Sequence, residues 1–282
     1  MVGETKPMKV AVIGHVEWVE FLRVDHVPKP GEIVAAGERW EEAAGGGAVA
    51  AVQLAKLAGS CDFYTALGDD ERGHRAVEEL EKRGVRVHAV FRPEPQRRGI
   101  TFIDQNKERT ITVIGEKMHP RLDEALPWDQ LKGYDAIYCT AGSPEVFKAA
   151  RQGTKVLVST ARELPNLEKS GVELDALVMS GNDPGERYNP GDLTTPPKMV
   201  FRTEGAKGGL CQPSGERWSA APLDGPIVDT YGAGDSFAAG LTYALGAGMA
   251  PKEAAEFGAR CSVQALQRRG AHGEDPQEKP ST

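Results

Sequence analysis

The stretch IVDTYGAGDSFAAGL, residues 227–241, decides how this sequence is interpreted. Three small residues, Gly232, Ala233 and Gly234, lie between the carboxylates of Asp229 and Asp235. The residues that follow are apolar, and their large side chains are spaced four apart, as on one face of a helix. We therefore predict that the glycine-rich turn opens a buried helix.

The start of such a helix is suited to binding an anion. Its first backbone N–H groups have no partners within the helix, and the helix dipole is positive there. Small side chains let a phosphate approach, so Gly232, Ala233 and Gly234 form a predicted anion hole. An acid in the first turn is an ordinary cap. Beside a phosphate, Asp235 also fits a general base that takes the proton of an attacking hydroxyl.

The rest of the chain alternates between strand-like and helix-like segments. Short apolar runs such as 8–14 and 61–68 indicate buried strands, and the amphipathic segment 71–84 indicates a helix. This alternation is typical of an α/β fold with a mostly parallel central sheet. Residues 15–40 and 97–115 have amphipathic strand patterns outside this rhythm. We predict that they form a small β-sheet lid over the main sheet.

Composition limits the domain organisation and the classes of partner. With 282 residues, 40% of them hydrophobic, the chain is long enough for a sizeable core, and we expect a single domain over 1–271. The polar tail 272–282 is expected to be disordered. A net charge of −7 without a basic run argues against nucleic acid as a partner. Scattered cysteines, no apolar leader and no membrane-length apolar run predict a cytoplasmic protein that binds no membrane.

Other nucleotide and catalytic motifs are missing from the sequence. There is no G-x-x-x-x-G-K-[ST] phosphate loop, and phenylalanine stands where a dinucleotide fingerprint needs its third glycine. No H-E-x-x-H pattern, clustered Cys/His pattern or G-x-S-x-G elbow occurs. The turn at 229–235 is therefore the leading candidate for a functional site.

The heptapeptide DTYGAGD at 229–235 resembles, in every fixed position, the D-T-x-G-A-G-D signature of the ribokinase, or PfkB, family of carbohydrate kinases. Weaker resemblances follow the order of that family along nearly the whole chain. They are PKPGEIV at 28–34, GGG at 45–47, LGDDERG at 67–73, TEGAKGG at 203–209 and RRGA at 268–271. The signature is specific enough to guide the assignment of the other stretches.

The resemblance implies a three-layer α/β/α sandwich with a β-sheet lid. It also implies an enzyme that uses Mg²⁺ and transfers phosphate from ATP to a hydroxymethyl group of a small molecule, with a sugar as the favoured acceptor. It implies Asp235 as the catalytic base and the amides of 232–234 as the anion hole. It also allows K⁺ or another monovalent cation at Asp229, and a homodimer contact through the lid. By position it assigns ATP binding to Asn182, Thr203, Gly205 and Gly208, and acceptor binding to Gly45, Gly46, Gly47 and Asp235.

Two departures from the family pattern concern the acceptor. Val19 stands where the family has an aspartate that binds sugar hydroxyls, and strand alternation puts Glu17 on the face of Val19 and Glu20 on the other face. Glu17 is the favoured replacement, and a solvated glutamate at the lid edge is the alternative. Val49 or Ala50 replaces an asparagine that reads a sugar hydroxyl, so we expect the pocket to be more apolar than a ribose site. Val19 and Val49 leave a nucleoside or vitamin-precursor kinase open as an alternative. The missing lid aspartate and the displaced glutamate described next leave open a catalytically weak ligand sensor.

A third departure concerns the metal. The N-x-x-E motif that orders Mg²⁺ through water appears here as NDPGE, residues 182–186. Asn182 fits the motif, but Glu186 comes one residue late. Asp183 or Glu186 could take the role of the glutamate if the loop bends at the intervening proline and glycine. An ordinary polar loop is the alternative interpretation.

Overall fold

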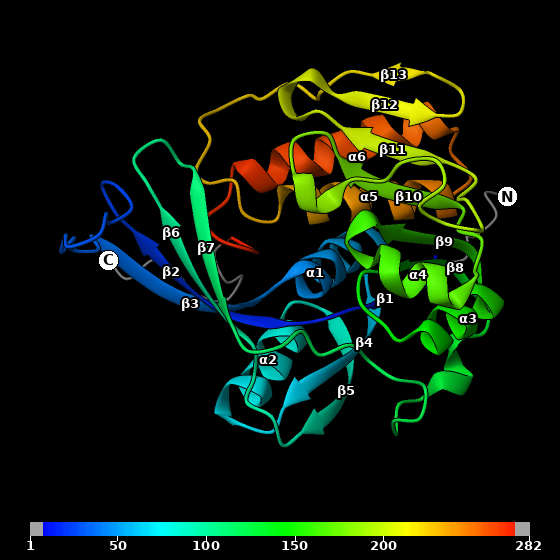
Figure 1. Cartoon of the computed structure of the whole chain (residues 1–282), viewed down its shortest axis with the longest axis horizontal. Helices are drawn as coiled ribbons and strands as arrows, with labels where there is room; N and C mark the ends of the chain where they lie inside the picture. Colours follow the sequence, from blue (N-terminus) through cyan, green and yellow to red (C-terminus); the bar gives the residue numbers. More distant parts are fainter. Residues whose placement is uncertain (1–7, 274–282) are drawn as a thin grey trace, which may run out of the picture.

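The computed structural model describes residues 8–273 of the chain, and all structural statements below refer to this part. Within it, six α-helices and thirteen strands are arranged as a large layered body with a smaller sheet projecting from one side (Figure 1). The helices are α1 Gly46–Ala58, α2 Glu71–Lys82, α3 Pro144–Gly153, α4 Leu164–Ser170, α5 Ala233–Gly246 and α6 Pro251–Leu266.

The central sheet has nine strands in the order β13-β12-β11-β10-β9-β8-β1-β4-β5. Its members are β1 Val10–Ile13, β4 Cys61–Gly68, β5 Val85–Arg92, β8 Tyr134–Cys139, β9 Thr154–Thr160, β10 Ala176–Ser180, β11 Val200–Thr203, β12 Gly209–Gln212 and β13 Arg217–Trp218. The strands from β5 to β11 are parallel, and β12 and β13 extend the sheet antiparallel at one edge. The continuous burial of β1 and β4 fits parallel strands covered on both faces.

Helices cover both faces of this sheet. One apolar cluster joins the sheet to α1, α2, α5 and α6, and a second cluster on the opposite face joins it to α3 and α4. The sequence explains the helix boundaries: Asp70 caps α2 by accepting from the amides of Arg72 and Gly73, and α1 ends at Gly59, which has a φ of 81°. The predicted three-layer α/β/α architecture is confirmed.

The lid is a separate four-stranded sheet in the order β3-β2-β6-β7. Its strands are β2 Glu17–Arg23, β3 Glu38–Ala44, β6 Arg98–Ile103 and β7 Arg109–Ile114. It projects from the body near the start of α1 (Figure 1). The strand β3 continues to Ala44, beyond the end at residue 40 that the sequence pattern predicts. This extension carries the chain directly from the lid into the glycines that precede α1.

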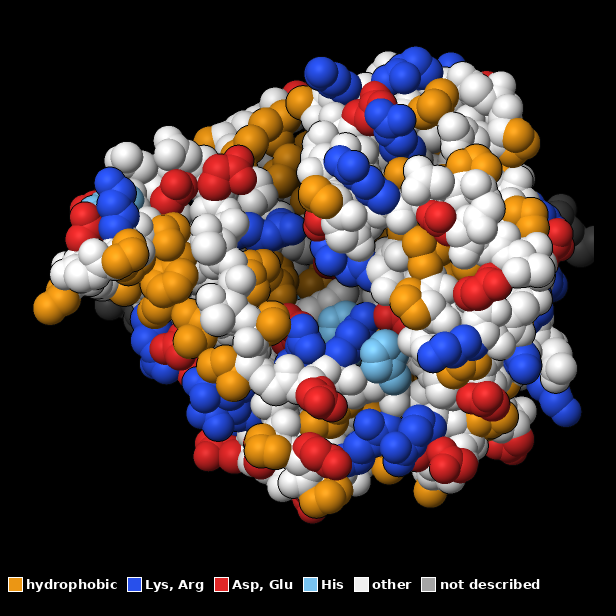
Figure 2. Space-filling model, in the orientation of Figure 1, with side chains coloured by type: hydrophobic (Ala, Val, Ile, Leu, Met, Phe, Trp, Pro, Cys, Tyr) orange, Lys and Arg blue, Asp and Glu red, His pale blue; other side chains and the backbone are white. Residues whose placement is uncertain are grey.

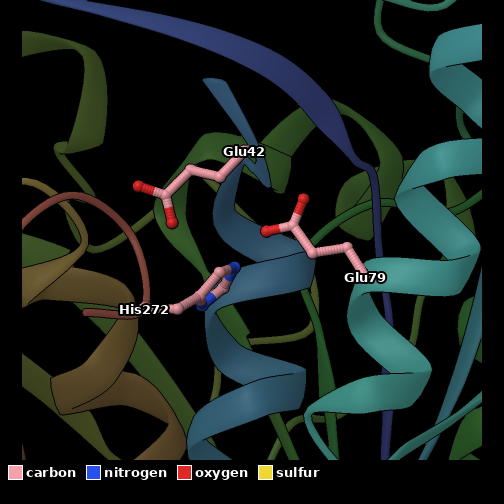
Figure 3. A group of neighbouring side chains, drawn as sticks. All are labelled: Glu42, Glu79 and His272. Atoms are coloured by element: carbon pink, nitrogen blue, oxygen red, sulfur yellow. The ribbon is translucent and has the colours of Figure 1, made fainter. Parts of the chain in front are cut away.

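The segment after α6 is folded against the lid base, which corrects the predicted disorder from residue 272. His272 is 3% exposed, and its Nε2 donates to the carbonyl of Ala43 at 2.6 Å. The rest of the predicted tail, 274–282, lies outside the described residues. Figure 3 shows the side chains of Glu42, Glu79 and His272 pointing toward one another from β3, α2 and this segment. We call these three residues the clasp.

The clasp predicts a pH dependence of stability. Burial and the neighbouring Glu42 raise the pKa of Glu79 from 4.5 to about 7. The folded state therefore holds this proton more tightly than the unfolded state, and the stability it contributes is lost as pH rises from about 4.5 to about 7. The side chain of Glu79→Gln can still accept from the amide of Ala43. We expect the Tm of this variant minus the Tm of the wild type to increase by roughly 2–5 °C as the pH is raised from 5 to 8. Calorimetric scans across this range test it, and a Tm difference that does not change with pH would contradict it.

Candidate active site

The glycine-rich turn at 229–235 lies at the edge of the sheet where parallel strands end. Thr140 directly follows β8, and its amide bonds the carbonyl of Ile13 at the end of β1. A Cβ built on Gly46 would lie 3.3 Å from Oγ1 of Thr140 and 2.8 Å from Oδ1 of Asp235. The starts of α1 and α5 therefore meet beyond the carboxyl ends of the central strands, where open α/β sheets bind ligands.

The turn before α5 leaves its amides available. Gly232 adopts a left-handed conformation with a φ of 71°, and a Cβ there would press on Val49. Ser236 donates back to the carbonyl of Gly232, whereas the amides of residues 232–234 have no hydrogen-bond acceptor among residues 8–273. A Cβ on Gly234 would meet nothing within 4 Å. An anion can therefore approach the positive end of α5.

Asp235 lies in the first turn of α5 with its side chain directed at Gly46. It is partly exposed. Burial by the surrounding protein and then the charge of Glu186 raise the pKa of Asp235 from 3.8 to about 6. A carboxylate with this pKa can accept a proton near neutral pH more readily than a solvated aspartate.

The glycines at 45–47 bring the backbone close to neighbouring chain. Gly45 has a φ of 86° and its amide donates to the hydroxyl of Tyr231 at 3.2 Å. A Cβ on Gly47 would lie 2.5 Å from the carbonyl oxygen of His15. Gly46, between them, faces Asp235. Gly45 and Gly47 are therefore required by packing, whereas a side chain at Gly46 would occupy the space next to the Asp235 carboxylate.

Glu17 is buried beside these glycines and is not solvated. It is 8% exposed, and Nε of Arg97 donates to its Oε1 at 2.7 Å. The charge of Glu17 is one of those that raise the pKa of Asp235. Glu20 instead pairs with Arg39. The alternative of a solvated glutamate at the lid edge is therefore wrong for Glu17.

Val19 and Val49 do not face a ligand. Both side chains are 0% exposed and pack in an apolar cluster with Phe21, Ile103 and Tyr231. The sequence pattern suggested that these valines make the acceptor pocket apolar. Their position corrects this interpretation, because their methyl groups hold the lid base to the turn before α5.

The residues assigned to nucleotide binding lie at the end of β11 and in the loops that follow β10 and β11. Thr203 ends β11, and its hydroxyl donates to the carbonyl of Met179 in β10 at 3.3 Å. Nδ2 of Asn182 lies 3.5 Å from a Cβ built on Gly205, so these loops are adjacent. A Cβ on Gly208 would come within 2.1 Å of the carbonyl oxygen of Trp218, so packing alone requires this glycine.

The loop with the displaced glutamate is held by a residue that the sequence did not single out. Arg162 donates to Oε1 of Glu186 at 2.7 Å and also pairs with Asp183. Asp183 in addition accepts from the amide of Gly185. Glu186 lies close enough to Asp235 to raise its pKa, whereas Asp183 is occupied in shaping the loop.

Asp229 is fully buried behind the turn. Its Oδ1 accepts from the amide of Tyr231 at 2.9 Å and its Oδ2 from the amide of Gly270 at 2.7 Å. Burial raises the pKa of this carboxyl. The carboxylate thus joins the glycine-rich turn to the segment after α6.

Several charged side chains near the site carry no local sequence signal. Figure 2 shows a hollow between the lid and the body, with Lys, Arg and His side chains on its floor. His15, Arg97, Lys117 and His119 come from loops next to β1, β6 and β7 and interact electrostatically with one another. Such a group could be found only by knowing how these separate segments fold together.

Comparison with known proteins identifies the family of this chain. Residues 8–163 and 192–278 match the sequence profile of the pfkB family carbohydrate kinases. The chain is 25% identical over 283 residues to an ATP-dependent ribose-1-phosphate kinase of Halopiger xanaduensis, covering 94% of each chain. Within residues 8–273, no helix combines the length and apolarity that crossing a membrane requires.

Solved structures have the same fold. The ribokinase of Thermotoga maritima matches with a TM-score of 0.75 and 25% identity, over 94% of this chain and 95% of the other. The ribokinase of Arabidopsis thaliana, solved with ribose and ATP, matches with a TM-score of 0.76 and 21% identity over 95% of both chains.

Proposed function

Since the chain belongs to the pfkB family of carbohydrate kinases, we propose that it transfers the γ-phosphate of ATP to a hydroxyl group of a small sugar. The observation that carries this proposal is the pairing of the unoccupied amides at 232–234 with the Asp235 carboxylate, which faces the glycines before α1. An anion hole and a base within one helical turn suit in-line phosphoryl transfer.

In the proposed step, the acceptor hydroxyl lies between Gly46 and Asp235. Its oxygen forms a bond to the γ-phosphorus while the bond from that phosphorus to the bridging oxygen breaks, and ADP leaves with the electron pair. Asp235 takes the hydroxyl proton. The amides of Gly232, Ala233 and Gly234 stabilise the charge on the transferred group. The lid excludes water, which limits hydrolysis of ATP.

Asn182, Thr203, Gly205 and Gly208 are proposed to line the ATP site, and their adjacency supports this. Mg²⁺ would neutralise charge on the phosphates. Glu186 fits a role in ordering it, because only Oε1 of its carboxylate is taken by Arg162 and carboxylate oxygens suit Mg²⁺. Asn182 is exposed beside it. Asp229, a buried carboxylate that accepts from the amides of Tyr231 and Gly270 within residues 8–273, is proposed to lie beside a K⁺-type cation.

Two broader assignments remain part of the proposal. The edge strand β7 is exposed along its length, and Ile111, Val113 and Ile114 are 40–47% exposed, which supports a homodimer through the lid. Cytoplasmic location is supported by four cysteines that are all buried and unbridged, as in proteins of a reducing compartment.

The test is ADP release by the purified protein with ATP, Mg²⁺ and a panel of sugars, sugar phosphates and nucleosides. Acceptor-dependent ADP with a sugar or sugar phosphate is expected. A preference for nucleosides would overturn the sugar assignment. Thermal stabilisation by ATP and by sugars without any acceptor-dependent ADP would indicate a ligand sensor instead of a kinase.

A further inference from the structure

Four side chains from the loops next to β1, β6 and β7 lie within electrostatic range of one another, and the proposed transfer gives them no role. They are His15, Arg97, Lys117 and His119, and we call them the basic wall. Burial and then the charges of Lys117 and Arg97 hold the pKa of His15 well below its usual range. Figure 2 shows such basic side chains on the floor of the hollow. Burial also lowers the pKa of His119, so the positive charge of the basic wall lies on Arg97 and Lys117, which pair with Glu17 and Glu163.

The basic wall is close to the position proposed for the acceptor hydroxyl. Nζ of Lys117 donates to the carbonyl of Thr140 at 3.1 Å. The hydroxyl of the same threonine lies beside Gly46, next to the Asp235 carboxylate. Arg97 reaches the site from the lid side, where it binds Glu17. A small molecule with a hydroxyl at Asp235 would therefore extend toward Lys117.

Several polar atoms of the basic wall have no partner among the described residues. Lys117 uses two of its three N–H groups, for the carbonyl of Thr140 and for Glu163 at 2.6 Å. Nδ1 of His15 and Nδ1 of His119 are buried without a hydrogen bond, and the nearest carboxylate oxygen to Nδ1 of His119 is Oε2 of Glu163 at 3.6 Å. Buried polar groups without partners are costly, so they indicate a ligand that supplies several acceptors.

A cavity adjoins the wall and provides the room. Its volume is about 330 Å³, and none of the residues that line it is acidic. Lys117 and His119 belong to both the wall and this cavity, whose other lining side chains include Arg92, Arg121, Ser143 and Asn166. This volume is at the small end of ligand pockets and is ample for a phosphate group.

From this arrangement we infer that the acceptor is a sugar phosphate, with its free hydroxyl at Asp235 and its phosphate monoester bound by Lys117, His119 and Arg97. The inference rests on the proposed kinase function. A dianion with three terminal oxygens matches several converging donors, and its hydrogen bonds to charged groups are strong. Glu17 and Glu163 keep Arg97 and Lys117 in position until the substrate binds. A neutral sugar would supply fewer acceptors for the third N–H group of Lys117 and no charge to complement Arg97 and Lys117.

The test compares acceptors in matched sets. ADP release is measured with ribose and ribose 1-phosphate, with fructose, fructose 1-phosphate and fructose 6-phosphate, and with gluconate as a carboxylate acceptor. We expect kcat/KM for one phosphate ester to exceed that for its parent sugar by about 100-fold or more. In Lys117→Gln the ratio of ester to parent sugar should fall by about 10- to 100-fold, since one charged hydrogen bond is lost.

Lys252→Gln, at an exposed lysine of α6, is the matched control and should leave that ratio unchanged. Calorimetric titration of Asp235→Asn with the preferred ester, with and without Lys117→Gln, measures acceptor binding without turnover, and Lys117→Gln should weaken it. Turnover of neutral sugars in preference to every ester would overturn the sugar phosphate and keep the kinase. A preference for gluconate would overturn the phosphate. If no acceptor causes ADP release, both the proposed function and this inference are wrong.

Discussion

Asp235→Asn is expected to lower kcat by about 10³-fold, because general-base catalysis contributes roughly 10²–10⁴-fold and asparagine cannot take the proton. Asparagine has nearly the same shape, so the amides at 232–234 should still bind the γ-phosphate. Nucleotide affinity, measured by titration calorimetry, should change by less than about threefold. A variant that keeps near-normal kcat would show that Asp235 is only a cap of α5.

The pH profile separates loss of the base from loss of geometry. Because burial and Glu186 raise the pKa of Asp235 to about 6, the ionised, active form is lost as pH falls below that value. The kcat/KM of the wild type should therefore decrease about tenfold per pH unit below pH 6. The residual activity of Asp235→Asn should lack this limb. If the wild type and Asp235→Asn both lose activity below pH 6, the titrating group is not Asp235.

The part of the site that sequence could predict is local in the chain. The amides and the carboxylate that we propose as anion hole and base lie within one turn of α5, and an unsatisfied helix N-terminus follows from the backbone alone. Placement of Glu17 on the inner face also followed from strand alternation, which depends only on neighbouring residues. Val49 shows where the same reasoning fails. Its replacement of a polar residue suggested an apolar pocket, but in the fold it packs against Gly232.

The rest depends on contacts between distant segments. Lys117 and His119 lie in a connection without a periodic pattern, and only the pairing of β6 with β2 brings Arg97 beside Glu17. No strand was predicted over β5, because Arg86 and His88 interrupt its apolar residues, or over β13, because it has two residues. His272 was assigned to a polar tail because no local signal shows that the carbonyl of Ala43 will accept from its ring.

The neighbouring glycines 46 and 47 allow the acceptor site to be tested apart from the fold. An alanine at 46 would place its Cβ 2.8 Å from Oδ1 of Asp235 and 3.3 Å from Oγ1 of Thr140, and both atoms end side chains. We expect Gly46→Ala to fold with Tm within about 2 °C of the wild type, since alanine suits the start of a helix. Its kcat/KM should fall by about 100-fold, because the methyl group occupies the space of the acceptor hydroxyl and displaces the base.

Gly47→Ala is the matched variant with the opposite expectation. Its Cβ would lie 2.5 Å from the carbonyl oxygen and 2.8 Å from the amide nitrogen of His15, and backbone cannot move aside as a side chain can. Overpacking of this kind costs about 1–3 kcal/mol, which should lower Tm by several degrees. Thermal melts and kinetics on both variants decide the matter. If Gly46→Ala kept near-normal activity, the acceptor hydroxyl could not lie between Gly46 and Asp235, and the proposed direction of attack would be wrong.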